Sequence, residues 1–277
     1  MTEPSPADDH TGRLIADFNA MAVTYDTLRH AQAGAHRLVD LMALTPGAQV
    51  LDLATGTGLA AFAALQRVGP TGTVVGVDIA PEMVEYAQQK ATAAGHTNVV
   101  FRLGDAARLE EPARRFDVVL CASGLFFMPD MLAALREWWR VLTPGGQVGF
   151  SGWGPTYQQP LLGLWHARLH QYGVPLPTAA PIQRLSAPTT CQQGLQEAGF
   201  VEVVVQSEQL GYYLRTPEEW WAQMWASRNR MAVLELAPAQ QAQFQAEYLA
   251  EVGALATPEG IWVDVATNFA RGRKPVA

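Results

Sequence analysis

Apolar and polar residues follow two different patterns along the chain. From about residue 12 to 45, apolar positions such as Leu14, Phe18 and Met21 recur at the three- and four-residue spacing of helices. After residue 46, short apolar runs such as QVLDLA and TVVGVD alternate with stretches long enough for helices. This alternation predicts a mainly parallel sheet covered by helices on both faces.

The pattern also divides the chain into segments. We expect a flexible amino terminus at 1–12, a helical lid at 13–45, and two cap insertions at 154–187 and 211–259. The sheet core would then consist of 46–153, 188–210 and 260–274. Within the later segments we expect helices at 161–172, 191–198, 217–230 and 238–252, a strand at 200–207 and a last strand at 261–270.

Composition narrows the function. The 277 residues are 49% hydrophobic and only 16% charged, and the formal net charge is -7 without a basic stripe, so nucleic acid is not an expected partner. The two cysteines cannot build a disulfide framework. The polar start MTEPSPADDH is unlike a signal peptide, and no run approaches about 18 apolar residues. We therefore expect a cytoplasmic monomer or homodimer without membrane contact that uses its apolar surface for a pocket or an interface.

The most informative segment is VLDLATGTGLA, residues 50–60, which combines a strand, a glycine loop and the start of a helix. Gly56 and Gly58 allow the backbone to approach a ligand closely, and the helix start offers free N–H groups. Asp78 ends the next strand, where an acid that binds a ribose belongs. The segment predicts a nucleotide-type cofactor, although the same spacing fits a dinucleotide site or a turn that serves only packing.

Further segments separate these cofactors. Asp52 lies inside the first strand, LGDAARL closes the third strand, and LTPGG precedes the fifth. Together with FNAMAVTYD, VDIAPEM, FDVVLCA and RVLTPGGQV, they make the chain resemble class I S-adenosylmethionine-dependent methyltransferases, most closely the branch of the ubiquinone and menaquinone biosynthesis C-methyltransferases. This resemblance implies an α/β, Rossmann-like fold with a seven-stranded, mainly parallel sheet. It also implies S-adenosyl-L-methionine as cofactor and S-adenosyl-L-homocysteine as product.

The resemblance assigns roles at the cofactor. Asp78 would bind both ribose hydroxyls, Ile79 and Met83 would pack against the adenine, and Asp105 with Ala106 would read the adenine amino edge. A turn carboxylate is the alternative for Asp105. The other implied contacts are Tyr25, Asp52, Ala54, Thr55, Gly56, Gly58, Gly104, Cys121 and Ser123. Ala54 stands where the wider family often has a third glycine.

Aromatic residues are the candidates for the substrate pocket. Phe126 and Phe127 follow the fourth strand, and Trp153 follows the fifth. In PEEWWAQMWASRNRM, three further candidates share one helical face, namely Trp221, Met224 and Trp225. The same stripe could instead be ordinary core packing. If it lines a pocket, it favours a flat, apolar, aromatic or heteroaromatic small-molecule substrate.

Candidates for proton transfer are few. His166 and His170 lie one helical turn apart in WHARLHQYG, but no third ligand is placed by sequence to complete a metal site, so no metal is predicted. His166 and Tyr25 are the catalytic candidates, with a solvated or packed histidine as the alternative for His166. A phenol acceptor would gain more from such a base than an electron-rich carbon would.

These observations predict methyl transfer by in-line displacement, with catalysis mainly from proximity and orientation. Carbon is the first choice of acceptor because of the C-methyltransferase resemblance, followed by oxygen or nitrogen. One alternative is an NAD-type oxidoreductase, against which Asp52 and the GDA and TPGG segments speak. Another is a binding or cyclisation protein that keeps the cofactor without transferring its methyl group.

Overall fold

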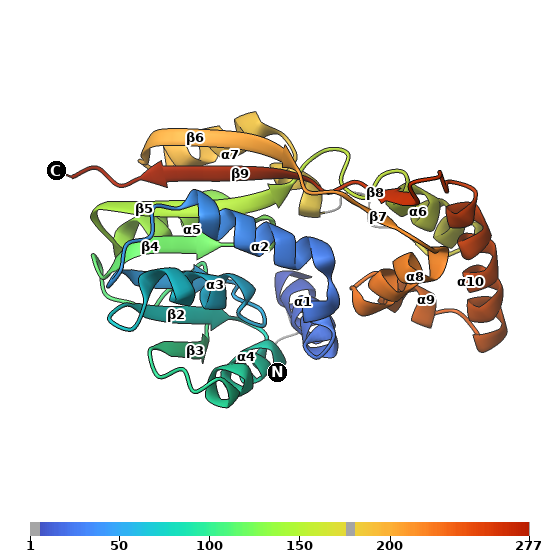
Figure 1. The fold of residues 1–277 in the computed structure, drawn as a ribbon, viewed down its shortest axis with the longest axis horizontal. Helices are drawn as coiled ribbons and strands as arrows, with labels where there is room; N and C mark the ends of the chain where they lie inside the picture. Colours follow the sequence, from blue (N-terminus) through green and yellow to red (C-terminus); the bar gives the residue numbers. More distant parts are fainter. Residues whose placement is uncertain (1–5, 176–180, 277) are drawn as a thin grey trace.

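A seven-stranded sheet forms the centre of the molecule in the computed structural model, which describes residues 6–175 and 181–276 (Figure 1). Its strand order is β3-β2-β1-β4-β5-β9-β6. The strands are β1 (Gln49–Leu53), β2 (Thr73–Asp78), β3 (Val99–Leu103), β4 (Phe116–Cys121), β5 (Leu142–Trp153), β6 (Val201–Gln209) and β9 (Ala266–Arg273). Strands β1 to β5 pair in parallel, and β9 runs antiparallel to both β5 and β6. The expected seven-stranded, mainly parallel sheet is therefore confirmed.

Helices cover both faces of this sheet. Helices α2 (Arg29–Leu41), α3 (Leu59–Val68) and α4 (Pro81–Ala93) share one apolar cluster with Val50, whereas α5 (Met131–Val141) and α7 (Pro188–Glu197) share the other with Leu51. Neighbouring residues of β1 thus point to opposite faces, as the pleat of a strand requires. Both faces are buried, which explains the nearly continuous apolar runs of the central strands.

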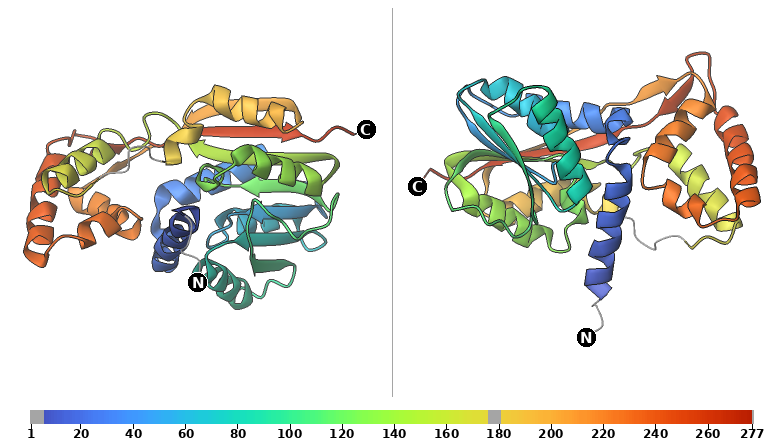
Figure 2. Two further views of the ribbon diagram at one scale, coloured as in Figure 1. Left: turned by 180° about the vertical axis from the view of Figure 1, so that it is seen from behind. Right: turned by 90° about the horizontal axis from the view of Figure 1, so that it is seen from below.

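The amino-terminal segment forms the lid. Helix α1 (Pro6–Met21), the 3-10 turn η1 (Tyr25–Thr27) and α2 follow one another, so residues 6–12 of the segment expected to be flexible belong to a helix, and 1–5 lie outside the described residues. Met21 packs in a cluster with Met83 of the core and Ala226 of the cap. Both views in Figure 2 place α1 between the sheet and the cap. The lid therefore contacts both parts.

The cap is mostly helical, and most of its buried apolar residues belong to the same cluster as those on one face of the sheet. It comprises α6 (Leu161–Gln171), η3 (Pro181–Leu185), α8 (Pro217–Ala226), α9 (Arg230–Leu234) and α10 (Pro238–Gly253), with the small sheet of β7 (Tyr212–Leu214) and β8 (Ile261–Val263). Trp220 Nε1 donates to the Tyr248 hydroxyl at 2.7 Å, and that hydroxyl donates to the Leu161 carbonyl at 2.8 Å. These bonds satisfy polar groups inside the centre of the cap. The helix expected at 217–230 ends at Ala226, four residues early.

The last predicted strand is two strands in the structure. β8 pairs with β7 in the cap, and β9 crosses into the main sheet. Asp264 lies between them, and its carboxylate accepts hydrogen bonds from Thr156 at 3.0 Å and from Gln209 at 2.8 Å. These side-chain bonds fix the bend between the two sheets, which an apolar pattern cannot reveal. Among residues 6–175 and 181–276, no helix is both long and apolar enough to span a bilayer.

Candidate active site

The loop between β1 and α3 has an unusual backbone. Ala54, Gly56 and Gly58 have φ values of 50°, 53° and 86°, all in the left-handed region. A Cβ atom at Gly58 would lie 2.8 Å from the Phe101 ring, so only glycine fits there. Ala54 adopts a left-handed conformation that is costly for a residue with a side chain. The loop thus has three left-handed residues, and alanine occupies the first of these positions.

Asp78 stands at the carboxyl end of β2, beside this loop. Its Oδ2 accepts the Gly56 N–H at 2.7 Å, and its Oδ1 accepts the Ala80 N–H at 2.9 Å. Burial raises the pKa of this carboxyl, whereas the backbone hydrogen bonds favour its charged form. Each oxygen retains a free lone pair. Two acceptors held side by side match the neighbouring hydroxyls of a ribose.

Asp52 is a second buried carboxylate, with only 1% of its surface exposed. Its Oδ2 accepts the Thr55 hydroxyl at 2.6 Å, but its Oδ1 has no partner among the described residues. Burial raises the pKa of Asp52 to about 7. It lines a small cavity with Tyr25, Ala54 and Thr55. An unpaired buried acceptor is unfavourable, so this place suits a cationic donor such as the amino group of the cofactor.

A cavity of about 180 Å³ opens where the parallel strands end. Asp78 and Asp105 both line this cavity, because Asp78 ends β2 and Asp105 follows the neighbouring strand β3. The described residues that line it include Leu14, Phe18, Tyr25, Ala54, Gly56, Asp78, Ile79, Asp105, Ala106, Ser123 and Phe127. This is the edge at which open α/β sheets bind their ligands.

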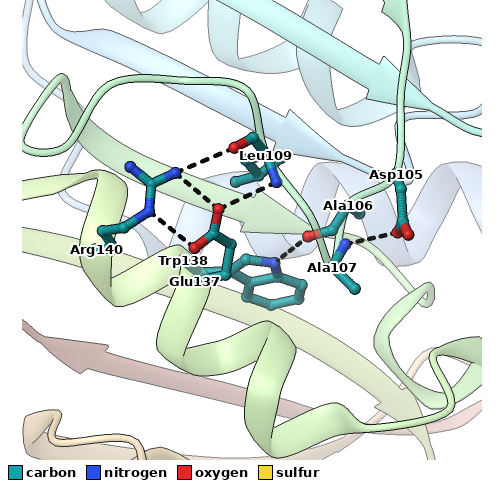
Figure 3. A network of polar contacts seen from close by, with 7 residues as sticks. All are labelled: Asp105, Ala106, Ala107, Leu109, Glu137, Trp138 and Arg140. Carbon is teal, nitrogen blue, oxygen red and sulfur yellow. Dashed lines mark hydrogen bonds and ion pairs between the residues drawn. The ribbon is translucent and has the colours of Figure 1, made fainter.

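The Asp105 loop is held in place by α5 (Figure 3). Asp105 accepts the Ala107 N–H at 2.8 Å, as a turn carboxylate does, and the Trp138 indole donates to the Ala106 carbonyl at 2.8 Å. Glu137 accepts the Leu109 N–H at 3.1 Å and pairs with Arg140. Asp105 is therefore a turn carboxylate, and together with Ala106 it also lines the cavity at the strand ends.

A second cavity, of about 170 Å³, lies between lid, core and cap. Tyr25 and Ser123 line both this cavity and the cavity at the strand ends. Burial, followed by the charge of Asp78, raises the pKa of Tyr25, so its phenol stays neutral. The described lining residues include Phe18, Met21, Tyr25, His30, Ser123, Phe126, Phe127, Trp153, Tyr157, Gln158, Trp220, Gln223, Met224 and Arg228. The described wall is mainly apolar, with seven aromatic side chains, and it also carries seven polar side chains, a mixture found in many small-molecule sites.

Four of the six expected substrate residues line this cavity, and two do not. Met224 is on the wall. Trp221 and Trp225 instead stack on each other, with 5.4 Å between ring centres, and pack against the apolar cluster that the cap shares with the sheet. Helix α8 presents Trp220 and Gln223 to the cavity instead. The face of α8 that lines the cavity therefore differs from the expected face. Periodicity did not identify it because α8 carries apolar residues on more than one side.

Five other expected residues lie outside the cavity linings, and one of them is Gly58 of the loop between β1 and α3. Met83 is fully buried in the cluster between lid, core and cap, and Gly104 donates its N–H to the Asp78 carbonyl at 2.9 Å. Cys121 is buried at the end of β4, where burial raises the pKa of its thiol. His166 is half-buried on α6, and burial lowers its pKa. The catalytic candidate His166 thus lines neither the cavity at the strand ends nor the second cavity.

Sequence reasoning missed most polar residues of the second cavity, among them His30, Gln158 and Gln223. The stretch RHAQAGAHR contains no signal that distinguishes buried His30 from exposed His36. Arg228 also lines this cavity. It forms an ion pair with Asp17 of α1 at 2.7 Å. Its guanidinium lies 5.4 Å from the centre of the Phe127 ring, in a cation–π position.

Comparisons with known proteins agree with this geometry. A family model for a methyltransferase domain matches residues 50–146. The nocamycin O-methyltransferase of Saccharothrix syringae is 31% identical over 273 residues, which cover 92% of this chain and 96% of that protein. This chain belongs to the class I S-adenosylmethionine-dependent methyltransferases. Its cofactor is S-adenosylmethionine, and the oxidoreductase alternative is not supported.

Two further comparisons cover different shares of the chain. The C-methyltransferase UbiE of Hydrogenovibrio crunogenus is 36% identical over 150 residues, 52% of this methyltransferase and 59% of that one. A SAM-dependent methyltransferase from Aquifex aeolicus superposes with a TM-score of 0.55 at 16% identity and covers 93% of this chain and 98% of that one. The second likeness shows the fold alone.

Proposed function

We propose that this methyltransferase methylates an oxygen atom of a small, largely apolar, aromatic or heteroaromatic metabolite. The observation that carries the proposal is the second cavity, whose described wall is mainly apolar and includes seven aromatic side chains. It shares Phe18, Tyr25, Ser123 and Phe127 with the cavity at the strand ends. A substrate held there would lie directly beside the cofactor.

The residues at the strand ends fit the cofactor. Asp78 would accept the ribose hydroxyls, Asp52 the amino group, and the Asp105–Ala106 turn the adenine edge. When bound, S-adenosylmethionine supplies a methyl group activated by its sulfonium. The chain has to align donor and acceptor and exclude water, and such positioning can contribute roughly 7–11 kcal/mol. Neutral Tyr25 would shield the reacting atoms.

The choice of oxygen departs from the first expectation of carbon. The C-methyltransferase relative matches only 52% of this chain, whereas the O-methyltransferase relative matches 92% and so includes the cap. The cap supplies Trp220, Gln223 and Met224 to the substrate cavity. The relative that includes the cap therefore bears more strongly on the acceptor than one that shares mainly the cofactor half.

The test begins with calorimetric titration of S-adenosylmethionine and S-adenosylhomocysteine. A library of phenols, enols, carboxylic acids, amines and electron-rich rings is then screened for a mass gain of one methylene unit. The position of the new methyl group is assigned by NMR, and a methyl group on oxygen is the expected result. A methyl group on carbon or nitrogen would overturn the acceptor assignment. Cofactor binding without methyl transfer to any compound would favour a cofactor-retaining binding or cyclisation protein.

A further inference from the structure

We propose that His30 accepts the proton of a neutral hydroxyl group on the substrate, a phenol or an enol, as that oxygen takes the methyl group. This inference deepens the proposed function and rests on its oxygen acceptor. It assigns a catalytic residue to a site whose lining otherwise only positions the substrate.

The position of His30 is set by contacts with the core. His30 is the second residue of α2, only 7% of its surface is exposed, and it lines the substrate cavity. Its ring lies edge-on to Trp153, with 5.5 Å between ring centres, and edge-on to Tyr157, with 5.8 Å. Trp153 and Tyr157 are themselves stacked at 4.3 Å. The imidazole therefore has a fixed place in the cavity wall.

The hydrogen-bonding capacity of this imidazole is unused. Its Nδ1 is buried without a partner, and neither ring nitrogen takes part in a hydrogen bond among the described residues. A neutral imidazole has one donor and one acceptor nitrogen. Buried polar groups in folded proteins are almost always paired. A substrate hydroxyl in the cavity would supply the missing donor.

The protonation states around the cavity favour His30 as the acceptor. Burial lowers the pKa of His30 to about 4, so its ring is neutral near pH 7. The other titratable or charged groups in the described lining are Tyr25, Tyr157 and Arg228. Burial raises the pKa of both tyrosines, so they keep their protons, and Arg228 is already a cation. Among the described lining residues, His30 is thus the group with a free basic lone pair.

The proposed step balances in atoms and charge. The hydroxyl oxygen forms a bond to the methyl carbon while the carbon–sulfur bond breaks and its electron pair returns to sulfur. The hydroxyl proton passes to a ring nitrogen of His30. A sulfonium is replaced by an imidazolium, so the site holds the same net charge before and after transfer. The proton leaves His30 to solvent when the product departs.

The chemistry also selects the substrate class. A carboxylic acid is already ionised near pH 7 and has no proton to lose, so it would not need His30. A phenol with the acidity of a tyrosine side chain, whose pKa is about 10, enters the site protonated. Its oxygen becomes far more acidic as the methyl bond forms. A base beside it is then useful only during the reaction, as general-base catalysis requires.

Binding of matched one-ring probes gives the first test. The probes are 4-methylphenol, its methyl ether 4-methylanisole, and 4-methylbenzoate, each titrated into the protein saturated with S-adenosylhomocysteine. Wild-type protein should bind the phenol roughly 5- to 10-fold more tightly than the ether, as one hydrogen bond allows. His30→Phe, which keeps a ring against Trp153 and Tyr157, should abolish this preference. His36→Phe, an exposed position on the same helix, should retain it. Equal affinity for phenol and ether in wild-type protein, or no binding of either, would overturn the proposal.

Turnover gives the second test. With 4-methylphenol, or the best phenol or enol of the library, His30→Phe should lower kcat about 100-fold or more near pH 7 and change KM much less. With 4-nitrophenol at mildly alkaline pH, where this probe is already an anion, the variant should approach the wild-type rate. An equal loss with both probes would overturn the proposal. Failure of the whole library with intact cofactor binding would instead count against the proposed function, and the binding comparison would still decide on His30.

Discussion

We expect Asp52 to make the affinity for the cofactor depend on pH. In the free protein, burial raises the pKa of this carboxyl to about 7, and its Oδ1 has no partner among the described residues. A cationic amino group at that oxygen would stabilise the carboxylate and lower its pKa. The free protein then carries a proton near pH 6 that the complex does not carry. By linkage, lowering the pH weakens binding and raising it strengthens binding.

The size of the effect follows from the same pKa. At about pH 8, roughly nine in ten free molecules have an ionised Asp52, whereas at about pH 6 roughly one in ten do. The Kd of S-adenosylhomocysteine should therefore be about tenfold higher at the lower pH. Calorimetry in two buffers with different heats of ionisation should also show release of nearly one proton on binding at about pH 6.

Asp52→Asn separates this effect from that of Asp78, whose pKa burial also raises. The variant keeps Asp78 and removes the titrating group, so its Kd should vary little between the two pH values. A wild-type Kd that does not change with pH would refute the reasoning. The same tenfold change in Asp52→Asn would assign the titration to another group.

Three substitutions test other parts of the site. Asp78→Ala should weaken cofactor binding about 10- to 100-fold without unfolding the protein, because two ribose hydrogen bonds are lost, and an unchanged Kd would remove that role. Gly58→Ala should destabilise the protein by about 1–3 kcal/mol and weaken cofactor binding, since its Cβ would lie 2.8 Å from the Phe101 ring; thermal unfolding that matches wild type would contradict this. Trp225→Ala should lower the thermal midpoint, because it removes the stack on Trp221, and should leave substrate KM nearly unchanged. A change in substrate KM without a lower thermal midpoint would contradict this and indicate that Trp225 contacts the substrate.

The sequence signals for the cofactor half of the site are local. Asp52, Gly56 and Gly58 lie within one strand and its following turn, and Asp78 ends the next strand. Parallel strands bring such ends to one edge of the sheet, so topology follows from the alternation of strands and helices. The seven strands and most helix positions were predicted for the same reason.

The substrate half depends on contacts between distant segments. Nothing near His30 indicates that it is buried, because its neighbours Trp153 and Tyr157 come from the end of β5 and the loop beyond it. Helix α8 has apolar residues around most of its circumference, so periodicity could not decide between Trp220 and Trp221 for the cavity. Such choices are made by tertiary packing and not by the local pattern.

Helix α1 lines both the cavity at the strand ends and the cavity between lid, core and cap. Leu14 and Phe18 line the cofactor cavity, Phe18 and Met21 line the substrate cavity, and Asp17 holds Arg228 of the cap. We therefore expect both ligands to exchange through movement of this one helix, so that the residence times of product and S-adenosylhomocysteine change together. A change that loosens the Asp17–Arg228 pair would shorten both residence times together, which couples the end of one catalytic cycle to the start of the next.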